Sequence, residues 1–369
     1  TASGFAACGK LFSSLFGVKY LTAMIISAIV IVAYTTLGGF LAASTTDFIQ
    51  SIIMSVALIV VLIFGVETAG GIGAVIHNAS ELPGYLSMTL SYDVNTGKAA
   101  PYSALTIVST AAWGLGYFGM PHILLRFMAI ADEKKLKLSR RVATIWVVIS
   151  LFVAVFIGVI GYTMSKVGAL EMLTGSNSET IIVKISALLS QHGVIFALLA
   201  GVILAGILAS TMSTSDSQLL AASSAVSSDI LGAFRKDSSN KNGSMAAARI
   251  TLLVISFVAA FIARNPDSSV FAIVSFAWAG FGAAFGPVVL FSLFWKRTSK
   301  WGALAGMVCG GSMVFIWKYL IRPLGGIWNI YELLPAFLIA CAAIVIVSLL
   351  TPKPSKEIEE EFDRVAQMK

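Results

Sequence analysis

Residues 112–121 read AWGLGYFGMP, at the end of an apolar run that begins near residue 103. Three glycines and a proline within eight residues are poor material for a regular helix. Inside a membrane, such irregular backbone persists only where protein or a water-filled cavity satisfies its polar groups. The stretch therefore predicts a break in a membrane helix, provided that the chain around it is a membrane protein.

The composition of the 369 residues supports that condition. Hydrophobic residues make up 57% of the chain and charged residues 12%, about half the quarter that is usual in soluble domains. A disordered chain is excluded because disorder combines low hydrophobicity with high net charge. Cys8, Cys309 and Cys341 lie far apart in apolar runs, so they indicate neither a disulfide framework nor a metal site. We expect an all-α polytopic membrane protein.

Nine apolar runs have lengths near the twenty residues that a helix needs to cross a bilayer. They cover residues 21–45, 48–70, 103–120, 142–165, 194–216, 250–263, 270–294, 302–319 and 331–350. Residues 1–9 resemble the end of a tenth span, and the run from 194 continues to about 227, so that helix must tilt, bend or protrude. The runs predict a transmembrane domain over 1–351 and a charged tail over 352–369.

The positions of Lys and Arg predict how the spans are oriented. Alternate loops and the C-terminal tail carry 17 of the 25 basic residues, and the opposite loops carry 8. Cytoplasmic loops are the ones enriched in Lys and Arg. The basic residues that give the net charge of +7 are therefore explained by membrane topology and do not indicate nucleic-acid binding. We expect the C-terminus to be cytoplasmic.

Trp113, Tyr117 and Pro121 recur every four residues along the broken stretch, so a helical conformation places them on one face. Discontinuous helices form the substrate and ion sites of secondary transporters, which makes the three residues candidates for a binding pocket. Trp and Tyr at a helix end also form the aromatic belt of the membrane interface. The two interpretations have equal weight from these residues alone.

A second polar break reads STMSTSDS from Ser210 onward. Four of its hydroxyl residues share one helical face: Ser210, Ser213, Thr214 and Ser217. Hard cations accept hydroxyl and carbonyl oxygens as ligands, but small polar residues are more often packing contacts between membrane helices. Asp216 is ionisable and lies in a membrane segment, so it is a functional candidate unless it reaches the interface.

Asp47 lies in a short polar stretch between the first two predicted spans, which we expect to be a tight cytoplasmic turn. Asp47 and Gln50 have the spacing of a helix-capping box, so spacing alone favours a structural role.

Glycine patterns at 282–286 and 302–310 have the small-xxx-small spacing of helix packing. A Walker loop, a dinucleotide fingerprint and a zinc-type His pair are all absent from the sequence, so we expect neither an ATP-driven pump nor an enzyme.

Taken together, several stretches resemble the solute:sodium symporter family. They are WGLGYFGMPHILLRF from Trp113, STSDSQLL from Ser213, AWAGFGAAFGPVVLF from Ala277, and GGFLA from Gly38 with Asp47 after it. The resemblance extends along essentially the whole chain, with the motifs in order. It implies a leucine-transporter-type bundle of two inverted five-helix repeats in a bacterial cytoplasmic membrane.

The resemblance implies sodium-coupled uptake of L-proline by alternating access, with Trp113, Tyr117 and Pro121 lining the proline pocket. A symporter for another small solute, such as pantothenate or another carboxylate, is the alternative within this class. A channel or a sensor module on the same fold is the alternative from another class. We expect no cofactor other than the coupling sodium ion.

The resemblance also implies an ion site. Ser213 and Thr214 would give hydroxyl oxygens to sodium, Ser210 would give its carbonyl, and Asp47 would lie on the sodium path. Relative to the family pattern, the first three helices and most of the fourth precede this sequence. We therefore expect a bundle that lacks its first helices, as in a fragment of a longer symporter.

Overall fold

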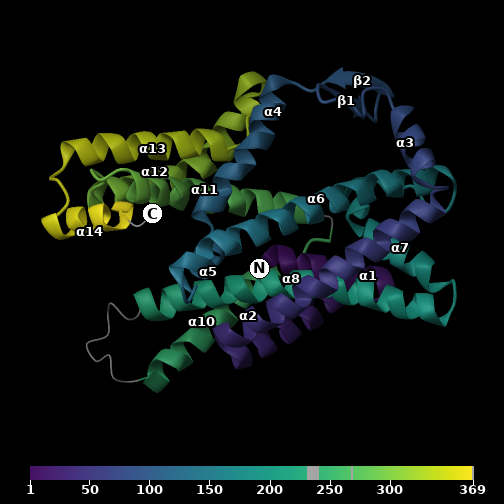
Figure 1. The fold of residues 1–369 in the computed structure, drawn as a ribbon, viewed down its shortest axis with the longest axis horizontal. Helices are drawn as coiled ribbons and strands as arrows, with labels where there is room; N and C mark the ends of the chain where they lie inside the picture. Colours follow the sequence, from purple (N-terminus) through teal and green to yellow (C-terminus); the bar gives the residue numbers. More distant parts are fainter. Residues whose placement is uncertain (231–240, 267–268, 368–369) are drawn as a thin grey trace. The chain divides into compact units, whose positions relative to one another are not determined.

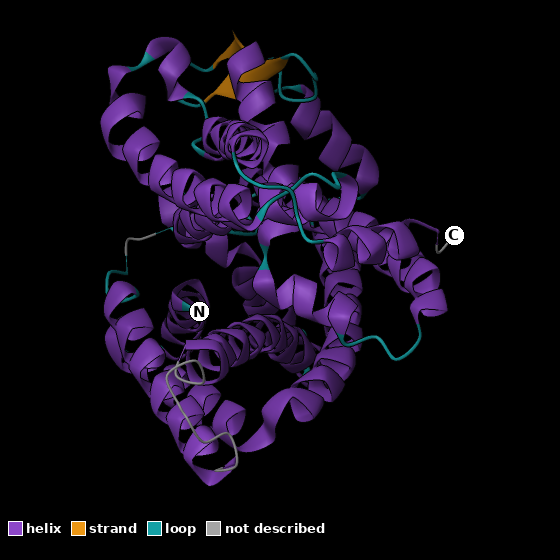
Figure 2. Cartoon of the chain, turned by 90° about the vertical axis from the view of Figure 1, so that its left-hand side faces the viewer, coloured by secondary structure: helices purple, strands orange, loops and turns teal. Residues whose placement is uncertain are grey.

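The computed structural model describes residues 1–230, 241–266 and 269–367 (Figure 1). Helices dominate this part of the chain, and its strands are a single pair, β1 (Leu90–Asp93) and β2 (Lys98–Pro101) (Figure 2). The prediction of an all-α protein is therefore confirmed. The chain forms two compact units, of which the first comprises residues 1–87, 92–99 and 130–273, and the second 88–91, 100–129 and 274–369.

The first unit buries its apolar side chains in two clusters. One joins the second half of α2 to α6, α7 and α8, and the other joins α1, the first half of α2, α8 and α10. The helices of this unit are α1 (Ala2–Phe16), α2 (Tyr20–Thr68), α3 (Ile72–Ser80), η2 (Glu133–Lys135), α6 (Leu136–Lys166), η3 (Gly175–Thr180), α7 (Ile181–Ser190), α8 (Val194–Ser224), the π-helical η4 (Ala225–Ile230) and α10 (Lys241–Ile262).

The long helix α2 is bent. The Tyr34 hydroxyl lies 3.4 Å from the carbonyl oxygen of Met212 on α8, whereas Ala57 packs against Gly206 of the same helix. At 1.5 Å per residue, a straight α2 would separate Tyr34 from Ala57 by about 35 Å, although Gly206 and Met212 are only about 9 Å apart. α2 therefore bends between Tyr34 and Ala57, and both of its halves lie along α8.

The tight turn predicted at Asp47 is wrong. The backbone is helical on both sides of Asp47, which lies in the interior of α2 and cannot cap a helix with Gln50. The helix continues through this polar stretch, because polar side chains there can donate to backbone carbonyls of the helix itself. The Thr46 hydroxyl donates to the carbonyl of Ala43 at 2.9 Å. Glycine pairs are typical of sharp helix bends, and Gly38 and Gly39 form such a pair within the bent interval.

The second unit is built around the packing of α12 on α13. A Cβ at Gly306 would lie 2.4 Å from the Ile344 side chain of α13, and a Cβ at Gly310 would lie 2.2 Å from the carbonyl oxygen of Ala283 on α11. A Cβ at Gly282 or Gly286 would likewise lie under 3 Å from a neighbouring segment, so the packing role predicted for the glycines at 282–286 and 302–310 is confirmed. The helices of this unit are α4 (Ala104–Ala111), η1 (Ala112–Gly119), α5 (Pro121–Met128), most of α11 (Val270–Phe294), α12 (Lys300–Ile316), η5 (Trp317–Ile321), η6 (Arg322–Leu324), η7 (Gly326–Asn329), α13 (Leu333–Leu350) and α14 (Lys356–Gln367).

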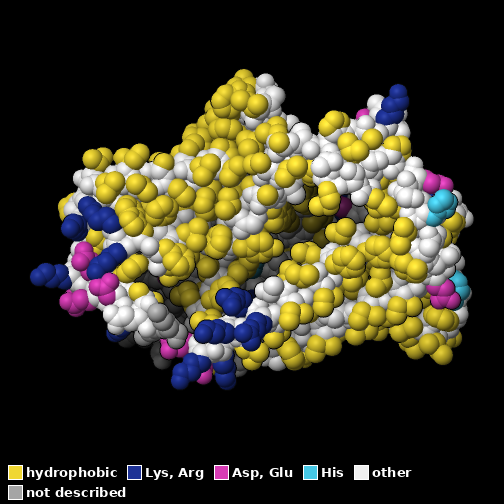
Figure 3. All heavy atoms as spheres, turned by 45° about the horizontal axis from the view of Figure 1, so that its top comes forward, with side chains coloured by type: hydrophobic (Ala, Val, Ile, Leu, Met, Phe, Trp, Pro, Cys, Tyr) yellow, Lys and Arg dark blue, Asp and Glu magenta, His cyan; other side chains and the backbone are white. Residues whose placement is uncertain are grey.

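Seven helical stretches in the described part are long and apolar enough to cross a membrane, and each matches a predicted run. They are Tyr20–Leu37, Ala43–Thr68, Glu133–Lys166, Val194–Ser227, Val270–Phe294, Lys300–Leu324 and Leu333–Leu350. The predicted run at 250–263 belongs to a shorter apolar helix, Ala246–Ile262. The run at 103–120 is the broken segment α4–η1. Hydrophobic side chains cover most of the face in Figure 3, as a membrane protein requires.

The two ends of the described chain are helical. The predicted stub at 1–9 belongs to α1, which continues to Phe16. The predicted tail contains the exposed helix α14, and Lys296 donates to Asp363 of this helix at 2.6 Å. Residues 368–369 of the tail lie outside the described residues. The division into a transmembrane domain and a tail stays a prediction.

Candidate functional site

The glycine-rich stretch is the helix break that the sequence predicts. α4 passes into η1, a 3-10 helix, and Met120 is extended before Pro121 begins α5. Proline suits the first position of a helix because the N–H that it lacks would have no partner within the helix there. Eight residues of 3-10 helix is long for this conformation, whose hydrogen-bond geometry is poorer than that of an α-helix.

Trp278 of α11 holds the 3-10 helix through Trp113. Its indole Nε1 donates to the carbonyl oxygen of Trp113 at 2.9 Å, and the two rings stack with centroids 5.4 Å apart. Tyr117 meets the Trp278 ring edge-on at 4.7 Å, and Tyr331 stacks on Trp113 at 6.1 Å. Two residues of η1, one of α11 and one of the loop before α13 therefore form one aromatic cluster in the second unit, with Tyr117 still 46% exposed.

The shared helical face predicted for Trp113, Tyr117 and Pro121 requires a correction. In a 3-10 helix of three residues per turn, residues four apart point about 120° away from each other, against about 40° in an α-helix. Trp113 and Tyr117 nevertheless both contact Trp278, with Trp113 stacked on its ring and Tyr117 perpendicular to it. Pro121 belongs to the next helix, beyond the extended Met120.

Two of the three glycines in the break permit the close approach of η1 to α11. A Cβ at Gly116 would lie 1.9 Å from Trp278 Nε1, and a Cβ at Gly119 would lie 2.3 Å from the carbonyl oxygen of Phe281. Gly114, in contrast, faces open space. The glycines that disrupt the α-helix thus also let the backbone pack directly on the neighbouring helix.

Tyr331 is itself fixed at both ends. Its backbone N–H donates to Ser109 Oγ at 3.0 Å, and its hydroxyl donates to the carbonyl of Ser275 at 2.6 Å. The next residue, Glu332, is 1% exposed and accepts a hydrogen bond from Arg322 at 2.8 Å. The residue that stacks on Trp113 therefore has little freedom to move.

The predicted sodium ligands lie on α8 in the first unit. The hydroxyls of Ser213 and Thr214 both donate to the carbonyl oxygen of Ser210, at 3.1 and 3.2 Å. The helix is regular at these positions. The structure therefore brings together the three oxygen atoms that the resemblance assigns to sodium.

The Asp216 side chain is fully buried in the first unit. Its carboxylate accepts hydrogen bonds from the Tyr34 hydroxyl of α2 and from Ser217 Oγ, the latter at 3.3 Å. The charge of Asp47 acts on both Tyr34 and Asp216, and Asp47 Oδ1 is buried. Two carboxylates and a tyrosine from α2 and α8 thus occupy one region, close in sequence to the three oxygens.

Comparison with known proteins identifies the family. A model of the sodium:solute symporter family matches residues 1–310. The chain belongs to the sodium:solute symporter family. Two curated members illustrate how far the similarity of this symporter extends. The osmoregulated proline transporter OpuE of Bacillus subtilis is 38% identical over 356 residues, which cover 96% of this chain and 68% of that protein. The sodium/proline symporter of Haemophilus influenzae is 40% identical over 369 residues, which cover 98% of this chain and 70% of that protein.

A solved structure shows the same fold as this symporter. It is the substrate-bound, outward-open state of a Na+-coupled sialic acid symporter, with a TM-score of 0.71 and 16% sequence identity. The similarity covers 96% of this chain and 74% of that chain. The leucine-transporter-type fold that the resemblance implied is therefore confirmed.

Trp278 and Tyr331 are the residues of this symporter's aromatic cluster that sequence reasoning missed. Trp278 lies in the stretch quoted for the family resemblance, but only the glycine pattern at 282–286 in that stretch was given a role, in helix packing. One signal was available: an indole N–H inside a protein usually needs an acceptor, so a Trp among small residues indicates a close carbonyl. Tyr331 lies at the start of an apolar run and carries no comparable signal.

Proposed function

We propose that this symporter couples the uptake of L-proline to sodium ions by alternating access. The observation that carries the proposal is the identity of 36–40% to several curated proline transporters over nearly the whole chain. Transport by this route needs no covalent step. Coupling requires only that sodium and proline favour the same conformation, and this linkage is reciprocal.

In this proposal the aromatic cluster recognises proline. The pyrrolidine ring offers an apolar face, and its protonated secondary amine is a cation that an aromatic face attracts. Tyr117 is the accessible aromatic of the cluster, and Trp113 lies beside it on Trp278. Pro121 begins α5, and the positive end of this helix dipole suits the proline carboxylate. The helix break thus supplies groups of opposite character for the two ends of the amino acid.

The sodium site in this proposal consists of Ser213 Oγ, Thr214 Oγ1 and the Ser210 carbonyl. The first two oxygens already lie within hydrogen-bonding distance of the third. Rotation of the two hydroxyls would turn their lone pairs toward an ion in place of that carbonyl. Oxygen ligands of this kind suit a hard cation. Asp47 supplies negative charge near the same helix and would attract sodium along its path.

We also propose that the protein resides in a bacterial cytoplasmic membrane with its C-terminus inside. The excess of Lys and Arg in one set of loops supports this orientation. The alternative substrates, pantothenate and other small carboxylates, share the carboxylate of proline but lack its ring amine. They would leave the aromatic cluster without its cationic partner.

Binding of radiolabelled proline to the purified full-length protein in nanodiscs tests the proposal. We expect sodium to increase binding, unlabelled proline to compete, and pantothenate at a hundredfold excess to leave binding unchanged. Trp113→Ala should weaken proline binding, whereas Trp301→Ala, at a 52% exposed position, should not. Displacement by pantothenate at proline-like concentrations would reject the substrate assignment.

The sodium dependence of the same binding tests the ion site. Thr214→Ala should raise the sodium concentration for half-maximal proline binding. Thr68→Ala is the matched control. The Thr68 hydroxyl, in α2, also donates to the carbonyl four residues earlier, that of Phe64, at 2.8 Å. Equal sodium requirements for both variants would show that Thr214 is not a ligand.

A further inference from the structure

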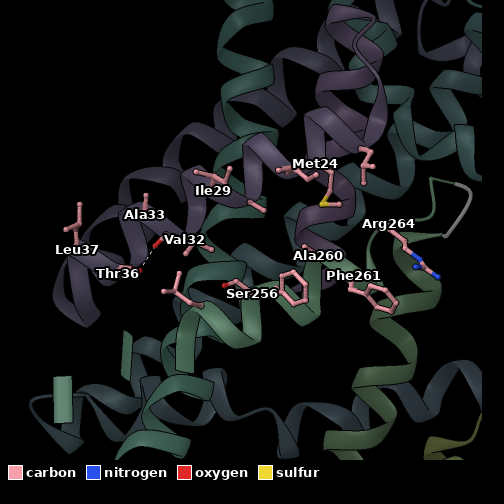
Figure 4. A pocket seen from close by; sticks show the side chains of 15 residues that line it. Met24, Ile29, Val32, Ala33, Thr36, Leu37, Ser256, Ala260, Phe261 and Arg264 are labelled. Carbon is pink, nitrogen blue, oxygen red and sulfur yellow. Dashed lines mark hydrogen bonds between the residues drawn. The ribbon is translucent and has the colours of Figure 1, made fainter. Parts of the chain in front are cut away.

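A long apolar groove lies between the first half of α2 and α10, both in the first unit (Figure 4). Its volume is about 810 Å³, and its lining is almost entirely hydrocarbon. The groove exists because small side chains face each other across the helix pair. Ala28 and Ala33 on α2 and Ala260 on α10 leave space, while Ile29 and Phe257 form exposed walls on either side.

The groove is long enough to hold a lipid acyl chain. Its lining runs from Leu21 to Leu37 along α2, which corresponds to about 24 Å at 1.5 Å per residue. One leaflet contributes about 15 Å to a hydrocarbon core of about 30 Å. Tyr20–Leu37 is long and apolar enough to span a membrane, and α10 contributes the apolar stretch Ala246–Ile262, so both helices that form the groove are apolar. An acyl chain of one leaflet fits within it.

Positive charge marks one end of the groove. Arg264 lines this end, with its guanidinium 4.2 Å from the centre of the Phe261 ring (Figure 4). The Tyr20 hydroxyl donates to the carbonyl of Ala263 at 2.6 Å, which sets the start of α2 beside the end of α10. Lys19 directly precedes Tyr20, so a second cation belongs to the same end.

We propose that this groove binds an anionic glycerophospholipid, with one acyl chain between α2 and α10 and the phosphate at Arg264. The guanidinium plane donates two parallel hydrogen bonds to a phosphate, and its stacking on Phe261 holds the plane in place. An apolar protein partner would fill the groove but would offer no negative charge to the cations at its end. The combination of a long dry groove with basic charge at one end is the chemistry of a lipid tail and headgroup.

Native mass spectrometry of the purified full-length protein, titrated with phosphatidylglycerol or phosphatidylcholine of the same acyl chains, tests this site. We expect phosphatidylglycerol to bind more tightly, and Arg264→Gln to weaken its binding by about fivefold, the effect of one basic residue near a lipid headgroup. Arg264→Lys should keep most of the preference, since the charge remains. Arg249→Gln is the matched control, because it removes the same charge from α10 near the start of its apolar stretch Ala246–Ile262, away from Arg264.

Filling the groove tests the acyl-chain part separately. Ala33→Phe and Ala260→Phe add bulk from the two walls and should weaken phosphatidylglycerol binding while Arg264 is intact. Val258→Phe adds the same bulk at an exposed position of α10 outside the groove and should have no effect. Unchanged binding in both groove variants, or equal affinity for the two lipids, would overturn the proposal. Disulfide-linked dimers of an Ala33→Cys variant in a membrane would also overturn it, by making a second copy the occupant.

Discussion

The indole Nε1 of Trp278 donates to the carbonyl oxygen of Trp113 at 2.9 Å, and the two rings lie 14° from parallel. A 3-10 helix makes weak backbone hydrogen bonds, and here a side chain of α11 supplies a donor to it. The position of Trp113 therefore depends on Trp278 as well as on its own segment. Trp278 is a positioning residue for the proposed proline pocket.

Trp278→Phe should raise the proline KM about tenfold, because it removes the donor to a backbone carbonyl while keeping the ring contact. We expect the maximal uptake rate to change much less than the KM. Initial rates of labelled proline uptake across a concentration series measure both quantities. Trp301→Phe, at a 52% exposed position of α12, serves as the control. A fall in thermal stability without a change in proline KM would mean that Trp278 only supports the fold.

Gly116→Ala should abolish proline uptake, since the new Cβ would lie 1.9 Å from Trp278 Nε1 and force η1 away from α11. Gly114→Ala introduces the same methyl group two residues earlier, where it meets open space, and should retain uptake. Uptake by cells that express equal amounts of each variant distinguishes the two. Equal activity of both would show that η1 and α11 do not pack as described.

Tyr34→Phe should lower the free energy of unfolding by about 1–3 kcal/mol, because the buried Asp216 carboxylate loses a hydrogen-bond donor. Thermal unfolding in detergent measures this loss. Tyr319→Phe removes the same hydroxyl from a 61% exposed residue and should leave the midpoint unchanged. Identical midpoints for both variants would contradict the bond between α2 and α8.

Arg322→Ala should destabilise the second unit by about 3 kcal/mol, since buried Glu332 would lose its partner at 2.8 Å and keep the more distant Lys318, at 3.8 Å. Arg364→Ala breaks an exposed ion pair with Glu361 and should cost less than about 1 kcal/mol. The two unfolding midpoints are compared in the same detergent. A smaller shift for Arg322→Ala than for Arg364→Ala would rule out the buried pair.

Hydrophobicity predicted most of the fold because membrane spans are long apolar runs, and seven of the predicted runs are spans in the described part. The break at 112–121 was equally readable, since glycine and proline act locally. A turn was expected at Asp47, because polarity was treated as a signal for a turn, but the backbone there stays helical. The Thr46 hydroxyl instead donates to a backbone carbonyl of the same helix. The sequence alone does not distinguish such a polar residue from one in a turn.

In the candidate site, too, the residues that were predicted are those whose positions depend on local sequence. Helical spacing predicted that Ser210, Ser213 and Thr214 lie together, and the hydroxyls of Ser213 and Thr214 do donate to the Ser210 carbonyl. Their role as sodium ligands came from the family resemblance and stays a proposal. Trp278 and Tyr331 were missed because contacts between distant segments are not encoded in local spacing. The buried position of Asp216 also depends on such a contact, its hydrogen bond from Tyr34.

Proline uptake into proteoliposomes that contain the full-length protein tests the central claim most directly. We predict that labelled proline accumulates when sodium is higher outside than inside, and that a sodium ionophore abolishes this accumulation. Equal uptake with and without a sodium gradient, or sodium flux that proceeds unchanged without proline, would contradict sodium-coupled proline symport.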